Sequence, residues 1–190
     1  MRDDGAVQHK TEDELAAGLA EVRRSPLSVG VVELIVRRPA VGERQILHVA
    51  ELNLTEGLAG DTWNQRTSKR TADGSPHPDM QLNVINARVS RLLAADDDSV
   101  RALAGDQLHV DLDLSSANLP AGTRLGLGSA IIEVTDQPHT GCAQFTQRFG
   151  LAAHRWVNSP DGRDLNLRGI NARVIQPGTV AFGDVIRKLR

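Results

Sequence analysis

Residues 119–135 read Leu-Pro-Ala-Gly-Thr-Arg-Leu-Gly-Leu-Gly-Ser-Ala-Ile-Ile-Glu-Val-Thr, and this stretch is the clearest guide to the fold. It holds two short aliphatic runs, Arg124–Leu127 and Ala130–Thr135, separated by a Gly-Ser pair. Runs of the same kind occur at Leu108–Leu112 and Ala172–Val174. Frequent short strands with Gly and Pro turns are typical of a β-barrel, so we expect one here.

The earlier part of the chain adds further strands. Ser28–Arg38 is rich in Val and Ile, and Arg44–Leu54 again has strand-like content, with Pro39 and Gly42 between them. This pattern predicts a hairpin. Gln81–Ile85 predicts a buried strand, and the asparagine after it can cap a helix. We expect a mainly β fold with peripheral helices, of the α+β class.

The chain begins with a predicted helix. Thr11–Glu14 has the spacing of a capping box, and the apolar residues after it recur on one helical face until Ser25-Pro26. The helix should end near Arg24. We therefore divide the sequence into an N-terminal helical extension, residues 1–27, and a β-barrel domain, residues 28–190.

Composition limits the classes of function. The 190 residues suffice for one compact core, and the net charge of -2 gives no basic field for a nucleic acid. Met1–Asp4 is polar, and no later segment is long and apolar enough to span a bilayer. A single cysteine implies neither a disulfide-forming compartment nor a structural zinc site. We expect a cytoplasmic protein that binds neither nucleic acid nor a membrane.

Cys142 is the residue best suited to carry chemistry. It follows Pro138-His139-Thr140-Gly141, between a predicted strand and a predicted helix. At the start of a helix, unpaired N–H groups stabilise a thiolate, and His139 and Arg148 can add positive charge. The alternative is that an isolated cysteine is a small buried hydrophobe. The polar residues before it argue against that alternative.

Basic residues near the end of the sequence suggest an anion site. Arg163, Arg168 and Arg173 occur in a segment that also holds Asn166 and Asn171. The planar guanidinium suits anionic groups such as a phosphate. The alternative is that each arginine lies on the solvated surface.

Several other features give weaker indications. The polar stretch Gly57–Pro78 predicts a long surface loop that acts as a lid or as a wall of the site. Asp61 and Asp184 each follow a glycine, where aspartate commonly makes a local turn, and Asp61 is equally a candidate for function. His48 and His109 lie in strand-like runs and are expected to be structural. No zinc-ligand spacing, nucleophile elbow, phosphate loop or dinucleotide fingerprint is present.

Together these motifs resemble the MOSC domain, named for the C-terminal domain of molybdenum cofactor sulfurases. The resemblance extends over roughly Val29 to Val185. Its most specific part is the cysteine segment with the downstream Arg-Gly and Gly-Asp pairs. The motifs, in order, are Gly57–Asp61, Gln81–Val84, Leu103–Leu108, Cys142–Gly150, Arg168–Val174 and Gly183-Asp184.

The resemblance implies a β-barrel in which the cysteine either carries a persulfide for transfer or coordinates the molybdenum of a pterin-bound cofactor. Relatives of the second kind reduce N-hydroxylated compounds. Cys142 would then be both the catalytic residue and the metal ligand. The residues expected to bind the molybdenum cofactor (molybdopterin) are His139, Thr140, Arg148, Arg168, Asn171 and Asp61.

Three functions remain open at this point. The first is a small oxidoreductase that acts on a small-molecule substrate and receives electrons from a separate protein. The second is a sulfur carrier that holds a persulfide on Cys142 and depends on a sulfur donor protein. The third is a non-catalytic binding module. The chain carries no pyridoxal phosphate domain, and one cysteine cannot hold an iron–sulfur cluster.

Overall fold

The computed structural model describes residues 8–189, so the polar stretch Met1–Asp4 lies outside the described residues. The helices are α1 (Glu12–Val22), α2 (Ala87–Ala94), α3 (Asp98–Ala102), α4 (Ala143–Asn158) and α5 (Pro160–Asp164), and the 3-10 turns are η1 (Trp63–Gln65) and η2 (Pro78–Met80). The strands are β1 (Val29–Arg37), β2 (Gln45–Leu47), β3 (Val49–Asn53), β4 (Gly57–Leu58), β5 (Leu82–Asn86), β6 (Leu108–Asp111), β7 (Arg124–Leu127), β8 (Ala130–Val134), β9 (Ile170–Gln176), β10 (Gly178–Ala181) and β11 (Val185–Lys188).

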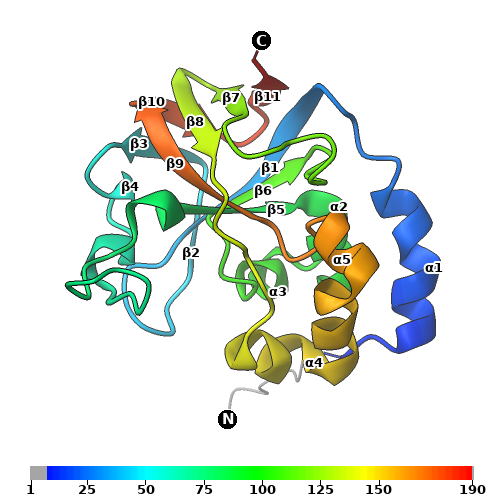
Figure 1. Cartoon of the computed structure of the whole chain (residues 1–190). Coiled ribbons are helices and arrows are strands. Elements are labelled where there is room, and N and C mark those ends of the chain that lie inside the picture. The colour runs from blue at the N-terminus through cyan, green and yellow to red at the C-terminus, as the bar shows by residue number, and fades with distance from the viewer. Residues whose placement is uncertain (1–7, 190) are drawn as a thin grey trace.

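Seven of these strands form a closed ring. Hydrogen-bonded neighbours follow the order β1, β11, β7, β8, β9, β5 and β6, and β6 pairs again with β1. The pair that closes the ring joins Val29–Val31 to Val185–Arg187 in antiparallel register. β2 pairs with the far end of β1, and β3, β4 and β10 form a separate sheet (Figure 1). The predicted β-barrel with peripheral helices is confirmed.

The neighbouring strands β5 and β6 are parallel. A parallel pair needs a crossover connection, and α2 and α3 supply it. Asn86 caps α2, as the sequence predicts, because its side chain accepts a hydrogen bond from the backbone N–H of Arg88. The turn between α3 and β6 carries Ala104 and Gly105, which lie at the candidate site.

Apolar side chains form two main clusters. The first fills the barrel and the space beneath β3 and β10. The second lies between the barrel and the helices that gather along one side of it (Figure 1), and its buried members are Leu15, Val22, Ile85, Val89, Leu93, Ala104, Phe145, Phe149, Ala153, Val157 and Leu167. This second cluster fixes α4 against the barrel, and with α4 the segment that carries Cys142.

The N-terminal helix α1 begins and ends as predicted. Thr11 and Glu14 form a reciprocal capping box, and Arg23 is the C-terminal cap. Leu15 and Val22 are buried in the same cluster as the side chains of α2 and α4. α1 therefore packs on the helices of the barrel domain, and the domain division at residue 27 stays a prediction.

Two parts of the strand prediction need correction. Arg44–Leu54 does not form one strand but divides at His48 into β2 and β3, which belong to different sheets. Neither β10 nor β11 is predicted from the sequence. Each has four residues, and only Val180 in β10 and Ile186 in β11 are buried, so their local pattern is weak.

The predicted long loop is present between β4 and β5. It contains the 3-10 turns η1 and η2 and otherwise irregular chain. One residue of this loop, Arg66, forms part of the wall of the candidate site. Within residues 8–189, no helix combines the length and the apolar character that crossing a bilayer requires.

Candidate functional site

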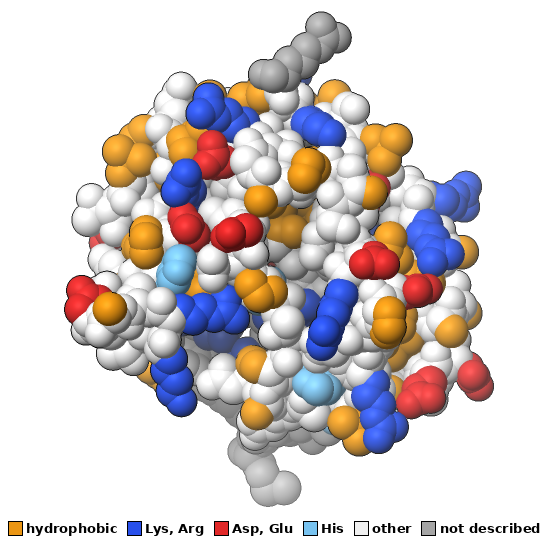
Figure 2. Space-filling model, viewed as in Figure 1, with side chains coloured by type: hydrophobic (Ala, Val, Ile, Leu, Met, Phe, Trp, Pro, Cys, Tyr) orange, Lys and Arg blue, Asp and Glu red, His pale blue; other side chains and the backbone are white. Residues whose placement is uncertain are grey.

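A cavity of about 450 Å³ lies between the barrel and the N-terminal end of α4. Figure 2 shows Lys and Arg side chains around a hollow on this face of the molecule. The cavity is of a size typical for small-molecule and cofactor sites. Its lining comes from segments far apart in the sequence and consists of Arg38, Val41, Gly42, Arg44, Arg66, Asn83, Ala104, Gly105, His139, Cys142, Gln144, Phe145, Arg148 and Arg168.

Cys142 lies at the wall of this cavity and its side chain is exposed. It is the N-terminal cap residue of α4, with extended backbone geometry, and its side chain makes no capping hydrogen bond. The thiol is therefore free to contact a ligand. The alternative that Cys142 is a small buried hydrophobe is wrong.

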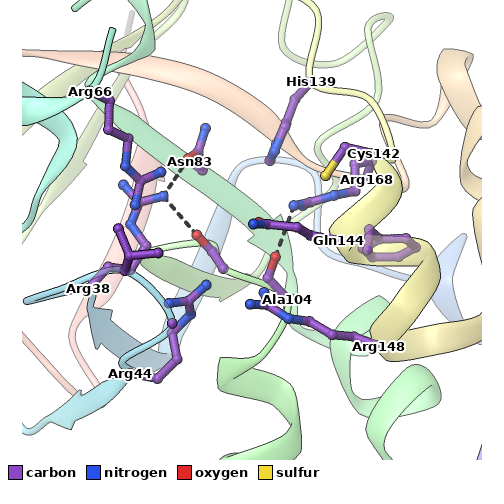
Figure 3. A pocket seen from close by; sticks show the side chains of 14 residues that line it. Arg38, Arg44, Arg66, Asn83, Ala104, His139, Cys142, Gln144, Arg148 and Arg168 are labelled. Carbon is purple, nitrogen blue, oxygen red and sulfur yellow. Dashed lines mark hydrogen bonds between the residues drawn. The ribbon is translucent and has the colours of Figure 1, made fainter.

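Arg38 lines the cavity and forms an ion pair with the buried carboxylate of Asp61. Its Nε and Nη2 donate to the two oxygens of Asp61 at 2.8 Å each, and its Nη1 donates to Asn83 Oδ1 at 3.0 Å and to Gly105 O at 2.9 Å (Figure 3). Arg38 and Asp61 are 3% and 1% exposed. Four of its five N–H groups are thus committed within the protein, and its charge is compensated.

Arg168 is held in a similar way on the opposite wall. Its Nη1 donates to both carboxylate oxygens of Asp106 at 2.9 and 2.7 Å, and its Nη2 donates to Ala104 O at 2.9 Å. The guanidinium carbon lies 5.0 Å from the centre of the Phe145 ring, a cation–π distance. Burial raises the pKa of Asp106, and the Arg168 guanidinium opposes that rise. Arg168 Nε is buried without a partner among residues 8–189.

Three further arginines of the cavity lack a carboxylate partner within residues 8–189, namely Arg44, Arg66 and Arg148. Each donates only to a neutral oxygen: Arg44 to the backbone of Glu43, Arg66 to a threonine hydroxyl and Arg148 to the backbone of Leu103. Among the described residues, none of the three arginines forms an ion pair, although the charge of the nearby Asp61 favours the charged forms of Arg44 and Arg66. An anionic ligand would supply the missing compensation.

Arg44 and Arg148 lie close together around Gly105. A Cβ atom built on Gly105 would lie 3.4 Å from Arg44 Nη2 and 3.8 Å from Arg148 Nη1, and the glycine has φ +86°. Burial, followed by the charge of Arg148, lowers the pKa of Arg44 to about 10. Two like charges held this close destabilise the empty site and favour the binding of an anion between them.

His139 lies on the same wall as Cys142 and Arg168 (Figure 3). Burial, together with the charges of Arg168 and Arg38, lowers its pKa well below the ordinary value. The ring is therefore neutral at physiological pH, and the expectation that His139 adds positive charge beside the thiol is wrong. Its Nδ1 lies 3.5 Å from Asp106 Oδ1 and has no hydrogen-bond partner among the described residues.

The other predicted site residues lie off the cavity. Thr140 is exposed and does not line it. Asp61 lies behind Arg38. Asn171 is buried, accepts from Asn83 Nδ2 at 2.7 Å and donates to the backbone of Gln137 in the segment before the cysteine at 3.0 Å. Asp61 and Asn171 therefore support residues of the site without lining the cavity. Thr140 faces solvent.

The predicted cluster of three arginines near the end of the chain is wrong, because only Arg168 lines the cavity. Arg163 is exposed on α5. Arg173 lies on the outer face of β9, where it pairs with Glu133 and Asp79. The alternation of a β-strand separates Arg173 from the buried face of β9.

Five polar residues of the cavity are not predicted from the sequence: Arg38, Arg44, Arg66, Asn83 and Gln144. Their residue types are common on surfaces, and although Asn83 and Gln144 fall within the quoted motifs, nothing in the sequence marks any of the five as lining a site. Nor does the cavity lining contain an aspartate or a glutamate. Within residues 8–189, no three His, Cys, Asp or Glu side chains group as metal ligands. A metal in this cavity would therefore be coordinated by the Cys142 thiolate and by a small molecule that binds together with the metal.

Solved structures share this fold. The YuaD protein from Bacillus subtilis superposes with a TM-score of 0.64 and 18% identity, over 85% of this chain and 97% of that chain. YiiM from Escherichia coli has a TM-score of 0.54 and 18% identity, over 84% and 70%. YiiM from Geobacillus stearothermophilus has a TM-score of 0.51 and 13% identity, over 87% and 75%.

Identities this low establish a common fold and no more. No curated protein sequence matches the chain significantly. The MOSC domain, in contrast, matches residues 81–187, which is more than half of the chain and includes Cys142 and Arg168. The chain belongs to the MOSC domain family.

Proposed function

We propose that the chain binds molybdenum cofactor in the cavity beside Cys142 and acts as a small oxidoreductase on N-hydroxylated or similar substrates. One observation carries the proposal. An exposed thiol and three arginines without a carboxylate partner border the same cavity, which has no acidic side chain in its lining. A thiolate is a soft ligand that suits molybdenum, and paired guanidinium groups suit a phosphate.

The residues of the site fit the two ends of such a ligand. Arg44 and Arg148, whose heads meet around Gly105, would hold the phosphate. The buried Nε atoms of Arg44 and Arg168 have no hydrogen-bond partner within residues 8–189, and a polar group of a bound anion would supply one. Cys142, which caps the helix that also carries Arg148 and lies across the cavity from Arg44, would bind the metal (Figure 3).

When bound, the cofactor would supply the two-electron redox chemistry, and a separate donor protein would supply the electrons. Reduction of an N–OH group to N–H consumes two electrons and two protons and releases water. Arg38 and Arg168, fixed by Asp61 and Asp106, keep the walls rigid. His139 stays neutral beside the thiol, and the loop that carries Arg66 limits access from solvent. A cytoplasmic location belongs to the same proposal.

The exposure of Cys142 also favours a second candidate, the sulfur carrier. In that reaction the Cys142 thiolate would attack the outer sulfur of a donor protein's persulfide. A new S–S bond would form on Cys142, and the donor's thiolate would leave. The uncompensated arginines have no evident task in this reaction unless they bind the acceptor of the sulfur.

Metal content tests the proposal directly. The protein, its Cys142→Ser variant and its Arg148→Met variant are purified from cells that make molybdenum cofactor, and molybdenum and pterin are measured together. We expect near-equimolar metal in the wild type, loss in Cys142→Ser and reduced pterin in Arg148→Met. Arg155→Met is the matched control, because Arg155 is an exposed arginine on the same helix.

Other outcomes discriminate the alternatives. Absence of molybdenum from the wild type, with the cofactor demonstrably present in the cells, would contradict the oxidoreductase. A mass increase of one sulfur atom on Cys142 after incubation with a cysteine desulfurase would then favour the sulfur carrier. Neither metal nor persulfide, with anion binding intact in Cys142→Ser, would favour a non-catalytic binding module.

A further inference from the structure

A second cavity of about 140 Å³ adjoins the first. The two cavities share three lining residues, Arg38, Arg66 and Asn83, so they meet at this edge. Arg38 and Arg66 lie across the main cavity from Cys142 (Figure 3). A ligand in this side pocket could therefore extend into the main cavity toward the thiol.

The walls of the side pocket include three ring side chains and a thioether. Trp63, Pro76, His77 and Met80 line it, and each is half-buried in the structure. All four come from the long loop between β4 and β5. Indole, imidazole and proline rings and a thioether offer broad surfaces that pack well against a planar ring. The lining holds no aspartate or glutamate that would attract a cation.

Two of the three residues at the shared edge of the cavities, Arg38 and Asn83, are committed within the protein, whereas Arg66 donates one hydrogen bond, to Thr62 Oγ1. Arg38 has four N–H groups committed in the plane of its guanidinium, and Asp61 compensates its charge. The Asn83 side chain is also committed, since its Oδ1 accepts from Arg38 and its Nδ2 donates to Asn171. Arg38 and Asn83 therefore offer few donors to a ligand, and Arg66 is the cationic side chain at this edge that lacks a carboxylate partner within residues 8–189.

Asp61 links both sides of this pocket. Its Oδ1 accepts from Arg38 Nη2 at 2.8 Å and from the backbone N–H of Trp63 at 2.9 Å. The same buried carboxylate therefore holds the Arg38 guanidinium and the backbone of Trp63. The indole N–H has no partner among residues 8–189, and His77 Nδ1 accepts from the backbone N–H of Asp79, which leaves the ring hydrogen on Nε2. Two donors are thus available to a polar edge of a ligand.

We propose that the side pocket between Trp63, Met80 and Arg38 binds a flat ring that carries no positive charge, and that this ring is the body of the substrate, whose reactive group extends into the main cavity. Its volume is close to that of an engineered cavity that holds one benzene molecule, about 150 Å³. The pocket therefore takes one six-membered ring. The assignment of the ring to a substrate rests on the proposed function.

Trp63 is itself the probe for the test. The chain has two tryptophans, so Trp156→Phe leaves Trp63 as the only one. The purified Trp156→Phe protein is titrated with benzamide, with cyclohexanecarboxamide, which is neutral but puckered, and with benzylamine, which is cationic at neutral pH. We expect a saturable change in Trp63 fluorescence with benzamide, and binding at least about tenfold weaker for the other two compounds, the equivalent of about 1.4 kcal/mol.

A filled pocket supplies the matched comparison. Met80→Phe, in the Trp156→Phe background, should weaken benzamide binding at least about tenfold. Leu27→Phe adds the same ring at an exposed position that lines neither cavity, and it should leave the affinity unchanged. Urea unfolding confirms that each variant is folded.

Three results would overturn the inference: no saturable change with benzamide, equal affinity for all three compounds, or unchanged binding in Met80→Phe. The molybdenum assay is independent of this titration. Ring binding without molybdenum would refute the cofactor while leaving the pocket, whereas molybdenum without ring binding would refute the pocket alone.

Discussion

Asn158 holds both polar groups of Gly141, the residue before the reactive cysteine. Its Oδ1 accepts from the Gly141 N–H at 3.1 Å, and its Nδ2 lies 3.4 Å from the Gly141 carbonyl oxygen. His154 Nε2 lies 3.2 Å from the same carbonyl. A Cβ atom on Gly141 would come within 2.9 Å of Asn158 Nδ2, so only glycine allows this contact. The C-terminal half of α4 thereby fixes the backbone at its own N-terminal end.

We predict that Asn158→Ala changes the reactivity of Cys142. Loss of the contact frees the Gly141 backbone, so the rate of Cys142 alkylation by iodoacetamide should change and molybdenum content should fall. The cost in stability should be only about 1 kcal/mol per lost hydrogen bond. Asn158→Asp keeps the acceptor for the Gly141 N–H and should behave as an intermediate. An alkylation rate equal to that of the wild type at every pH tested would contradict a positioning role.

We predict that a small polyanion stabilises the protein through Arg44 and Arg148. Inorganic pyrophosphate should raise the melting temperature of the wild type, because it compensates two adjacent charges. Arg44→Met and Arg148→Met should lose most of this rise, and the anion-free proteins should be no less stable, since burial and mutual repulsion already lower the pKa of Arg44. Arg155→Met, on the exposed face of α4, should respond like the wild type. Equal responses in all four proteins would refute this anion site.

Stability should depend on pH through His109. Burial lowers the pKa of His109 to about 3, so below pH 6.5 the unfolded state binds a proton that the folded state does not. Stability is therefore fully present above pH 6.5 and falls with decreasing pH, by about 2 kcal/mol at pH 5. His139 contributes with the same sign. Urea unfolding at pH 5 and above pH 6.5 measures this loss of stability. The His109→Asn variant should lose less stability at pH 5 than the wild type, and an equal loss would contradict the role given to His109.

Removal of Asp106 should be far more damaging than removal of a surface carboxylate. Asp106→Ala leaves the buried Arg168 without its partner, which should lower the free energy of unfolding by about 3–5 kcal/mol. Glu133→Ala breaks pairs that involve the exposed Arg173 and Arg124, and should cost less than about 1 kcal/mol. Urea unfolding compares the two. Similar losses in both variants would show that the Arg168 pair has no special role.

The sequence predicts those parts of the fold that depend on local patterns. The capping box at Thr11 and the asparagine cap of α2 mark helix starts through contacts within one turn. The strands β7 and β8 follow from short aliphatic runs with glycine turns between them. β10 and β11 escape prediction because each is stabilised by pairing with strands that are distant in the sequence rather than by its own four residues.

The sequence predicts a residue of the candidate site only where a reactive residue type is rare in the chain. Cys142 is the single cysteine, and its polar surroundings mark it. Arg44 and Arg66 are two of many basic residues, and they meet at the cavity because the β1–β2 hairpin and the long loop bring them there. Asp61 combines both cases: its turn position is local, whereas its contact with Arg38 is set by tertiary structure. Contacts between residues that are distant in the sequence leave no local sequence pattern by which they could be predicted.

Closure of the barrel has a consequence for synthesis on the ribosome. The pairing of Val29–Val31 with Val185–Arg187 closes the ring, so nearly the whole domain must leave the exit tunnel before the ring can close. Until then β1 has an open edge, and the hairpin that carries Arg44 lacks its final support. Such distant pairing slows folding and leaves apolar edges open to other chains. The barrel therefore reaches its closed form late in synthesis, only after β11 has been made.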